Sequence, residues 1–212
     1  MALPILSLAE LTRRKPPAVE LCAYTPASLA ALVPGLAPGT ITEITGARSS
    51  GRTALVQAAL AAATQEGELC ALVDGGSTFC PASAQAAGIV LDRLLWVQCG
   101  RHLQHSLQAA DLILSGGGFR VMVLDLCEFR AEELQRIPHS RWHRFRLAVE
   151  QTPGMLLITA GQPVARQSAT TQIQLAPRTA HWSGNLLRGL DLEASLRKPV
   201  RAETARLRVL AG

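Results

Sequence analysis

The sequence predicts an α/β fold in which a mainly parallel central sheet is flanked by helices. Between residues 40 and 160, short apolar and β-branched runs alternate with helical segments, and such alternation is typical of parallel sheets with helices on both faces. A glycine-bounded loop separates the first of these strands from the first helix. After Thr170 the alternation stops and short strand-like runs follow, which predicts a mixed or antiparallel C-terminal sheet edge.

The alternating region contains five expected strands, of which the first is a β-branched run and the others are short runs rich in apolar residues. They are Thr40–Thr45, Leu69–Val73, Leu94–Val97, Val121–Asp125 and Met155–Thr159. The four expected helices are Thr53–Thr64, Pro81–Ala87, His102–Leu114 and Ser140–Glu150. In the third helix the apolar residues recur at helical spacing, and Gly116–Gly118 end it. The expected C-terminal strands are Ile173–Leu175, Leu190–Leu196 and Leu207–Leu210.

The expected domain organisation is simple. Residues 1–30 are expected to be a lead-in segment, because Pro16 and Pro17 disfavour regular structure around them. Residues 31–212 are expected to form one domain, with residues 177–212 as its C-terminal tail. The length of 212 residues allows a sizeable core, and a composition of 48% hydrophobic and 17% charged residues favours a folded chain.

Composition also bounds the function. No apolar run reaches transmembrane length, and residues 1–10 lack the basic start and uninterrupted apolar stretch of a signal peptide. We therefore expect a cytoplasmic protein without a membrane partner. The net charge of +5 is compatible with a nucleic-acid partner but does not identify one. The five cysteines form no C-x-x-C pair, so neither a zinc site nor a disulfide framework is expected.

The strongest motif is a loop with G-x-x-x-x-G-[K/R]-[S/T] spacing between the first strand and the first helix. Its residues are Gly46, Ala47, Arg48, Ser49, Ser50, Gly51, Arg52 and Thr53. Such a loop turns backbone N–H groups and a helix N-terminus toward an anion, so it predicts a phosphate-binding loop. Thr53 is placed to bind Mg²⁺, and Arg52 stands where a lysine normally reaches the β- and γ-phosphates. Two alternatives stay open: the loop binds ATP with Mg²⁺, or it is inherited and no longer binds nucleotide, because arginine does not replace lysine conservatively.

From residue 32 to residue 160 the chain resembles the RecA family of P-loop proteins. Ile41–Gly46, Cys70–Asp74 and Val121–Asp125 are similar to the family's Walker A strand, second strand and Walker B strand. The resemblance implies a RecA-like P-loop fold, and it implies that Asp125 holds the Mg²⁺ shell. The alternative for Asp125 is a strand-end aspartate that caps the following turn.

The departures from the family pattern point away from catalysis. The family's catalytic glutamate corresponds to Gly76, and without a carboxylate nothing at that position orients an attacking water. Ser83 and Cys80 stand where the family has a base-stacking aromatic and an acidic adenine contact. The glutamine that senses the γ-phosphate is out of register at Gln162, and the DNA-binding loop is reduced to Pro163–Ser168. These losses imply a chain that is not a working recombinase and has no catalytic residue.

A small RecA-like chain with these losses resembles the ImuA type, which is also labelled RecA-like or SulA-like. The resemblance implies a damage-inducible (SOS) factor of translesion DNA synthesis and DNA repair. Its implied partner is a catalytically inactive, Y-family-like polymerase subunit of the ImuB type, with RecA itself and single-stranded DNA as further partners. Trp182–Ser183 and Leu186–Glu193 also fit the C-terminal pattern of this group.

The segment from residue 130 to residue 146 interleaves basic residues with Trp142 and Phe145. This pattern suits single-stranded nucleic acid, through phosphate contacts and base stacking. The candidate phosphate contacts are Arg136, Arg141, Arg144 and Arg146. The alternative, which we favour, is an amphipathic helix whose aromatic residues face the core and whose arginines are solvated.

The C-terminal tail combines leucines with a cationic end. Apolar anchors rimmed by basic residues are usual at protein interfaces, so we expect this surface to bind a partner and to be separable from folding. The partner-binding candidates are Leu186, Leu187, Leu190, Arg197, Lys198 and Arg201. Leu192 and Leu196 are counted among the apolar positions of this surface. The alternative is a charged hairpin edge that deters aggregation.

The preferred interpretation is a non-catalytic interaction module. One rival is a slow DNA-dependent ATPase that uses Arg52, Thr53 and Asp125. A second rival is a SulA-like cell-division inhibitor, which would bind a tubulin-like polymer instead.

Overall fold

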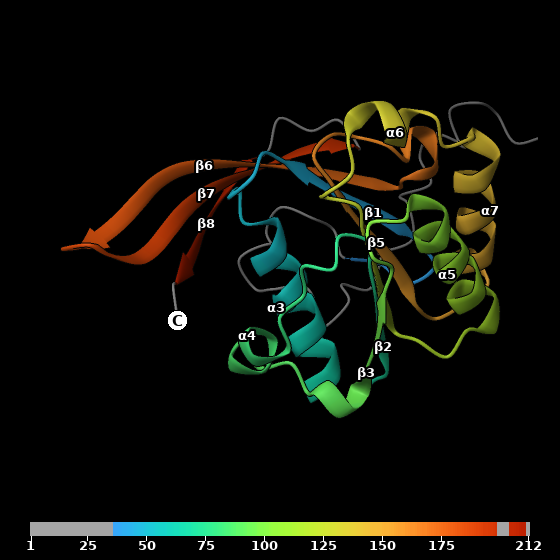
Figure 1. Cartoon of the computed structure of the whole chain (residues 1–212), viewed down its shortest axis with the longest axis horizontal. Coiled ribbons are helices and arrows are strands. Elements are labelled where there is room, and N and C mark those ends of the chain that lie inside the picture. Colours follow the sequence, from blue (N-terminus) through green and yellow to red (C-terminus); the bar gives the residue numbers. More distant parts are fainter. Residues whose placement is uncertain (1–35, 199–203, 211–212) are drawn as a thin grey trace, which may run out of the picture.

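One sheet forms the framework of the molecule. The computed structural model describes residues 36–198 and 204–210, so the expected lead-in 1–30 and Arg201 lie outside the described residues. Within these ranges eight strands form a sheet in the order β3-β2-β4-β5-β1-β6-β7-β8. The first six in this order are parallel, and β7 and β8 are antiparallel to their neighbours. The predicted α/β fold with a mainly parallel sheet and an antiparallel C-terminal edge is confirmed (Figure 1).

The elements follow the expected alternation. The strands are β1 (Ile41–Gly46), β2 (Cys70–Asp74), β3 (Leu94–Gln98), β4 (Val121–Asp125), β5 (Met155–Ala160), β6 (Thr171–Ser183), β7 (Leu186–Lys198) and β8 (Thr204–Leu210). The helices are α3 (Arg52–Gln65), α4 (Pro81–Ala86), α5 (Leu103–Gly116), α6 (Ala131–Gln135) and α7 (His139–Glu150), with short 3-10 turns η1 (Leu91–Arg93) and η2 (Arg166–Ser168). In the part of the chain that the structure describes, no helix combines the length and the apolar character needed to cross a membrane.

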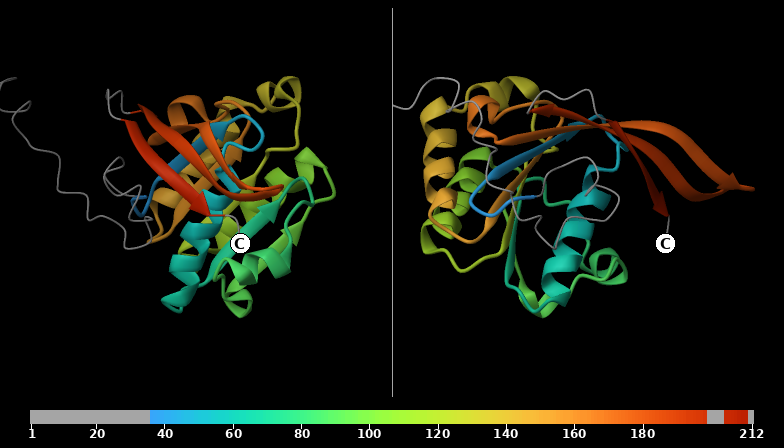
Figure 2. Two further views of the ribbon diagram at one scale, coloured as in Figure 1. Left: turned by 90° about the vertical axis from the view of Figure 1, so that its left-hand side faces the viewer. Right: turned by 180° about the vertical axis from the view of Figure 1, so that it is seen from behind.

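Helices cover both faces of the sheet, and each face buries its own hydrophobic cluster (Figures 1 and 2). On one face α3 packs through Leu55 and Leu60. On the other face α5 and α7 pack through Leu107, Trp142 and Phe145. Strands β1 and β5 are buried along their whole length between these layers. β5 is accordingly mostly apolar, whereas β1 also buries the polar side chains of Thr42, Glu43 and Thr45.

The carboxyl ends of the parallel strands meet at one edge of the sheet. Asp74 at the end of β2 lies beside Asp125 at the end of β4, and Asp125 lies beside Thr159 of β5. Thr45 of β1 lies beside Ala160 of β5, so the loop after β1 starts at the same edge. Ligands bind open parallel sheets at this edge, and the fold therefore gathers the loops after β1, β2 and β4 where a ligand site is expected.

Strands β6 and β7 are longer than the sequence predicted. Each has 13 residues, and their pairing continues from Gln172 with Lys198 to Ser183 with Leu186. In β6 the residues paired with β1 are those from 171 to 175, so the outer parts of β6 and β7 project beyond β1 (Figure 1). We call residues 176–183 and 186–193 the hairpin arm. The prediction of short strands separated by turns is wrong here, because most outer positions of β6 are exposed and so lack the alternation that marks a half-buried strand.

Candidate functional site

The loop from Gly46 to Thr53 joins β1 to α3 at the edge where the parallel strands end. Gly51 precedes α3 with a φ of 86°, in the left-handed region that favours glycine. It also lies close to β7, because a Cβ at this position would be 2.1 Å from Cδ1 of Leu192. The chain turns tightly into the first turn of α3, whose N–H groups have no carbonyl partner within the helix. The expected strand–loop–helix context is present, and it presents a helix N-terminus suited to an anion.

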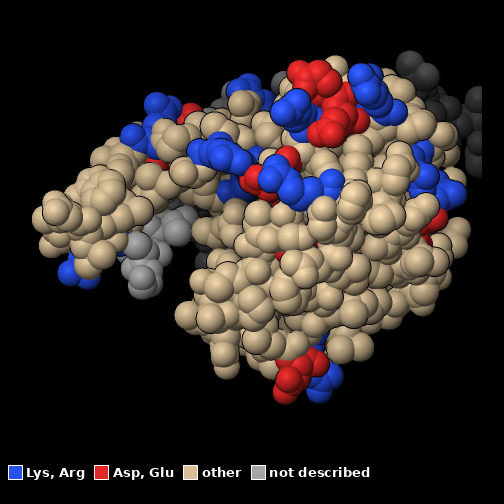
Figure 3. Space-filling view, viewed as in Figure 1, with Lys and Arg blue, Asp and Glu red and all other residues tan. Residues whose placement is uncertain are grey.

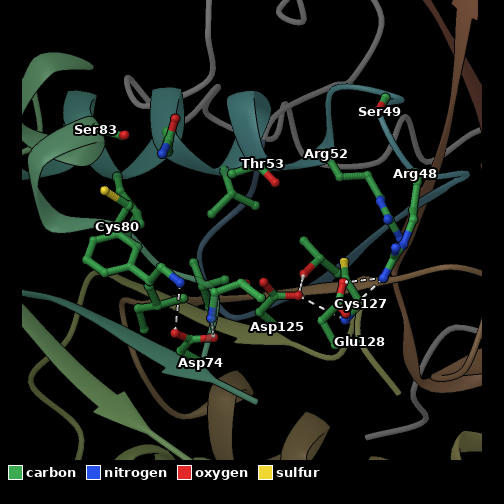
Figure 4. Close-up of a pocket in the computed structure, with 18 residues that line it drawn as sticks. Arg48, Ser49, Arg52, Thr53, Asp74, Cys80, Ser83, Asp125, Cys127 and Glu128 are labelled. Carbon is green, nitrogen blue, oxygen red and sulfur yellow. Dashed lines mark hydrogen bonds and ion pairs between the residues drawn. The ribbon is translucent and has the colours of Figure 1, made fainter. Parts of the chain in front are cut away.

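Arg52 begins α3, and its side chain extends from the helix toward Cys127 (Figure 4). Only 9% of Arg52 is exposed, and its buried Nη1 has no hydrogen-bond partner among the described residues. The Oγ of Ser50, in the same loop, is also buried, and residues 36–198 and 204–210 offer it no hydrogen-bond partner. A guanidinium nitrogen buried without a hydrogen-bond partner is costly, so Arg52 is placed to donate to an anion at this end of the site.

A pocket of about 470 Å³ opens beside the loop, between α3, α4 and the ends of β2 and β4. Its apolar wall is formed by Val56, Leu60, Leu72, Phe79 and Val123. Its polar end is formed by Arg48, Ser49, Arg52, Thr53, Asp125 and Glu128. Cys80 and Ser83 line the side nearest α4. The pocket therefore combines a polar end, where two arginines and the start of α3 suit phosphate, with an apolar wall that suits an uncharged group of the same ligand.

Asp125 ends β4 at the polar end of the pocket. Its Oδ1 accepts hydrogen bonds from Oγ1 of Thr159 at 2.8 Å and from the N–H of Cys127 at 2.9 Å. Asp125 therefore caps the turn that follows β4, as the alternative interpretation of this residue expected. The carboxylate also lines the pocket together with the Thr53 hydroxyl, and these two oxygen groups suit Mg²⁺. Burial and the neighbouring Asp125 raise the pKa of Cys127 to about 12, so its thiol is neutral rather than nucleophilic.

Asp74 ends β2 and holds the segment that follows it. Its carboxylate accepts hydrogen bonds from the N–H groups of Thr78 and Phe79, both at 3.0 Å. It also accepts one from Nε1 of Trp96 at 3.3 Å. These bonds fix the backbone around Gly76, the position that carries no side chain.

Glu128 and Arg101 are site residues that the sequence did not identify. Nη2 of Arg48 donates to Oε1 and Oε2 of Glu128 at 3.1 and 2.9 Å. Nη2 of Arg101 lies 3.6 Å from Oε2 of Glu128. Glu128 also fills the space beside Gly76, because a Cβ at residue 76 would lie 2.6 Å from Cγ of Glu128. No motif marks these residues; they meet only because the loops after β1, β3 and β4 converge at one edge.

The aromatic residues of segment 130–146 belong to the core. Trp142 and Phe145 are buried, with ring centroids 5.9 Å apart, so the favoured amphipathic-helix alternative is present and these rings are not available for base stacking. None of the four candidate arginines lines the pocket beside the loop. They are Arg136, Arg141, Arg144 and Arg146. Arg144 and Arg146 form ion pairs with acidic side chains of α5 and α7, and DNA contact by this segment stays a prediction.

The inner half of the tail is part of the folded core. Leu192 and Leu196 are buried in the cluster under α3, and Leu190 packs against it. Nζ of Lys198 donates to the carbonyls of residues 167 and 169, and Nε of Arg197 donates to a glutamine side chain of β6 at 2.7 Å. The expectation that the whole tail is separable from folding is therefore wrong for this half, because its leucines are buried against α3.

The tip of the hairpin arm is apolar and exposed. Trp182 is 61% exposed and Leu186 is 54% exposed, and Leu187 pairs with Trp182 across the hairpin. Two basic side chains of the arm pair with acidic ones on the facing strand, Arg178 with Glu193 and His181 with Asp191. Figure 3 shows few charged side chains at the outer end of the arm and several Lys or Arg side chains at its base.

Comparisons with known proteins agree with the fold described above. A family model described as the RecA N-terminal domain matches residues 7–130. Over 93 residues the chain is 36% identical to Protein RecA of Nitrobacter winogradskyi and 37% identical to Protein RecA of Rhodopseudomonas palustris. These matches cover 44% of this chain but only 25% and 26% of the two relatives. Among solved structures, the crystal structure of the RadB recombinase is similar, with a TM-score of 0.65 and 18% identity over 86% of this chain and 93% of that one. At that identity the likeness shows the fold alone.

Proposed function

Because the chain belongs to the RecA N-terminal domain family, we propose that it is a nucleotide-binding accessory factor of DNA repair rather than a recombinase. The observation that carries nucleotide binding is the buried Nη1 of Arg52, a pocket-lining residue; this atom has no hydrogen-bond partner in the part of the chain that the structure describes. The polyphosphate of ATP supplies the missing counter-charge. Thr53 and Asp125 supply oxygen ligands for Mg²⁺, which neutralises part of the phosphate charge when bound.

Binding of a fluorescent ATP analogue in the presence of Mg²⁺ tests this function. Arg52→Ala should weaken binding by about tenfold or more, because a hydrogen bond to a charged group contributes roughly 1.5–3 kcal/mol. Arg93→Ala is the matched control, because it removes an exposed arginine of η1 outside the pocket. Wild-type affinity in a folded Arg52→Ala variant would contradict the role of Arg52, and absence of binding by the wild type would refute nucleotide binding itself.

Two features support a role other than strand exchange. The segment between β5 and β6 is short and contains only the turn η2, so the long loop that the family uses to hold single strands is not built here. Residue 76 has no side chain, and its neighbour Glu128 is engaged by two arginines. The second candidate function, a slow DNA-dependent ATPase, is favoured by the presence of the Glu128 carboxylate in the pocket. ATP turnover that rises with single-stranded DNA would favour it over the first.

We further propose that this factor acts in SOS-induced translesion synthesis. In this role the tip of the hairpin arm docks an inactive Y-family-like polymerase subunit. The exposed Trp182 and Leu186 support this docking, because tryptophan and neighbouring arginines are the residues on which protein interfaces most often depend. Arg188 lies next to them on β7. Strand β8 pairs with β7 only as far out as Gly189, so the tip beyond it is two-stranded. A two-stranded hairpin is only marginally stable in water, and contact with a partner would also stabilise this tip.

A pull-down with the purified polymerase subunit tests the docking. The double variant Trp182→Ala, Leu186→Ala should lose binding while its melting temperature stays near that of the wild type. Leu112→Ala is the control, because Leu112 is an exposed leucine on α5, away from the arm. Unchanged binding by the double variant would refute this docking surface, and capture of a tubulin-like polymer instead would favour the SulA-like rival.

A further inference from the structure

One carboxylate ties together three loops at the mouth of the pocket. Glu128 follows β4, Arg48 belongs to the phosphate loop, and Arg101 connects β3 to α5. Arg48 holds both carboxylate oxygens of Glu128, at 3.1 and 2.9 Å. Arg101 approaches the same carboxylate at 3.6 Å and donates to the backbone carbonyl of Glu128 at 3.3 Å. The three side chains form a cluster that we call the mouth cluster.

The members of the mouth cluster differ in how tightly they are confined. The side chain of Glu128 is 23% exposed and that of Arg48 is 81% exposed. Glu128 lies in the space that the missing side chain of Gly76 leaves, since a Cβ there would be 2.6 Å from its Cγ and 2.9 Å from its Cβ. Glu128 is therefore held in place by its surroundings. Arg48 lies largely in solvent, where an arginine changes partner with little loss of packing.

The carboxylate of Glu128 lies in the same pocket as Arg52 and Thr53. A polyphosphate that enters this pocket meets a negative charge, and like charges in one site oppose each other. It also meets Arg48 already engaged by a carboxylate. Both hydrogen bonds to the carboxylate come from Nη2 of Arg48, and this nitrogen is also a suitable donor to a phosphate.

We propose that Glu128 is an internal competitor of the ligand, which holds Arg48 until a polyphosphate displaces it and so sets the affinity of the pocket. This inference rests on the nucleotide binding proposed above. In the exchange Arg48 moves from the carboxylate to the phosphate, and Arg101 remains to neutralise Glu128. The exchange favours ligands with several negative charges, because a singly charged anion replaces the carboxylate without any electrostatic gain.

Titration calorimetry of the full chain with ATP and Mg²⁺ tests the proposal. Glu128→Gln keeps the shape beside Gly76 but removes the charge, so it should bind ATP about twofold to fivefold more tightly than the wild type, the range of one exposed ion pair. Glu132→Gln is the matched control. It removes the same charge from an exposed position on α6 outside the pocket, and its affinity should equal that of the wild type.

A second variant identifies the exchanged partner. In an Arg48→Gln background the gain from Glu128→Gln should shrink, because no ion pair between these residues has to be broken. If Glu128→Gln does not melt cooperatively, Arg101→Gln replaces it, and the unneutralised carboxylate should then weaken ATP binding about twofold to fivefold. Equal or weaker binding by a folded Glu128→Gln variant overturns the competition. Binding by neither the wild type nor Glu128→Gln refutes nucleotide binding itself, and the competition with it.

Discussion

Replacing Glu43 by alanine should remove the contact that ties β1 to the segment after β5 and to β6. Glu43 is fully buried, and its Oε1 accepts hydrogen bonds from the backbone N–H groups of Val164 and Ala165. Its Oε2 accepts a hydrogen bond from Nε2 of Gln172 at 2.9 Å. The free energy of unfolding should fall by about 3–5 kcal/mol, because each buried donor left without an acceptor costs roughly 1–3 kcal/mol.

The same carboxylate gives the stability a pH dependence of defined sign. Burial raises the pKa of Glu43 above its ordinary value of 4.5, against the opposing hydrogen bonds from Val164, Ala165 and Gln172 and the charge of Lys198. The folded protein therefore holds this proton more tightly than the unfolded chain. The stability that the proton contributes is fully present below pH 4.5 and is lost as the pH rises through the folded-state pKa. Glu43→Gln removes the titration, so the wild type should lose stability relative to this variant as the pH rises.

Urea unfolding of the wild type, Glu43→Ala and Glu43→Gln at several pH values measures both effects. Glu132→Gln on α6 serves as an exposed control, whose stability should follow that of the wild type. A loss below about 1 kcal/mol for Glu43→Ala at neutral pH would refute the hydrogen-bond reasoning, since that is an ordinary substitution effect. A constant difference between the wild type and Glu43→Gln across the pH series would refute the titration.

The other predictions concern the pocket, assembly and tail. Gly76→Glu should not restore ATP turnover, because the new side chain would meet Glu128; DNA-stimulated turnover within about tenfold of an ordinary RecA, a barrier difference of roughly 1.4 kcal/mol, would contradict this. Electron microscopy with single-stranded DNA and an ATP analogue should show no RecA-style filaments, and regular helical filaments would disprove the expectation. Arg197→Glu should leave the unfolding free energy within about 0.5 kcal/mol. Lys198→Glu should lower it by more, because its ammonium holds two backbone carbonyls and faces Glu43; equal melting curves for the two variants would contradict this difference.

The fold was predictable because its signals are local. Each central strand is a short β-branched or apolar run, and Gly46 and Gly51 mark the loop that joins β1 to α3. The length of the hairpin arm was not predictable, because strand pairing there does not depend on burying one face. The burial of Leu192 and Leu196 also escaped prediction, since their location depends on which helix covers β7, and that follows from the assembled sheet.

The candidate site was predictable only as far as the loop motif reaches. Arg52, Thr53 and Asp125 line one pocket, as the motif and its strand context indicated. Glu128 and Arg101 lie 27 residues apart in the chain, and no spacing rule connects them. Their meeting depends on the strand order of the sheet, in which β2 stands between β3 and β4.

The close approach of Leu192 to Gly51 brings the phosphate loop into direct packing contact with the hairpin arm. Leu192 belongs to the strand that carries the arm outward, and its methyl group fills the space where a side chain on the loop would stand. A shift of the loop would therefore displace Leu192 at the inner end of the hairpin arm, whose outer end is exposed. Any ligand at the loop that changes the affinity of a partner at the tip must have its own affinity changed by that partner by the same factor.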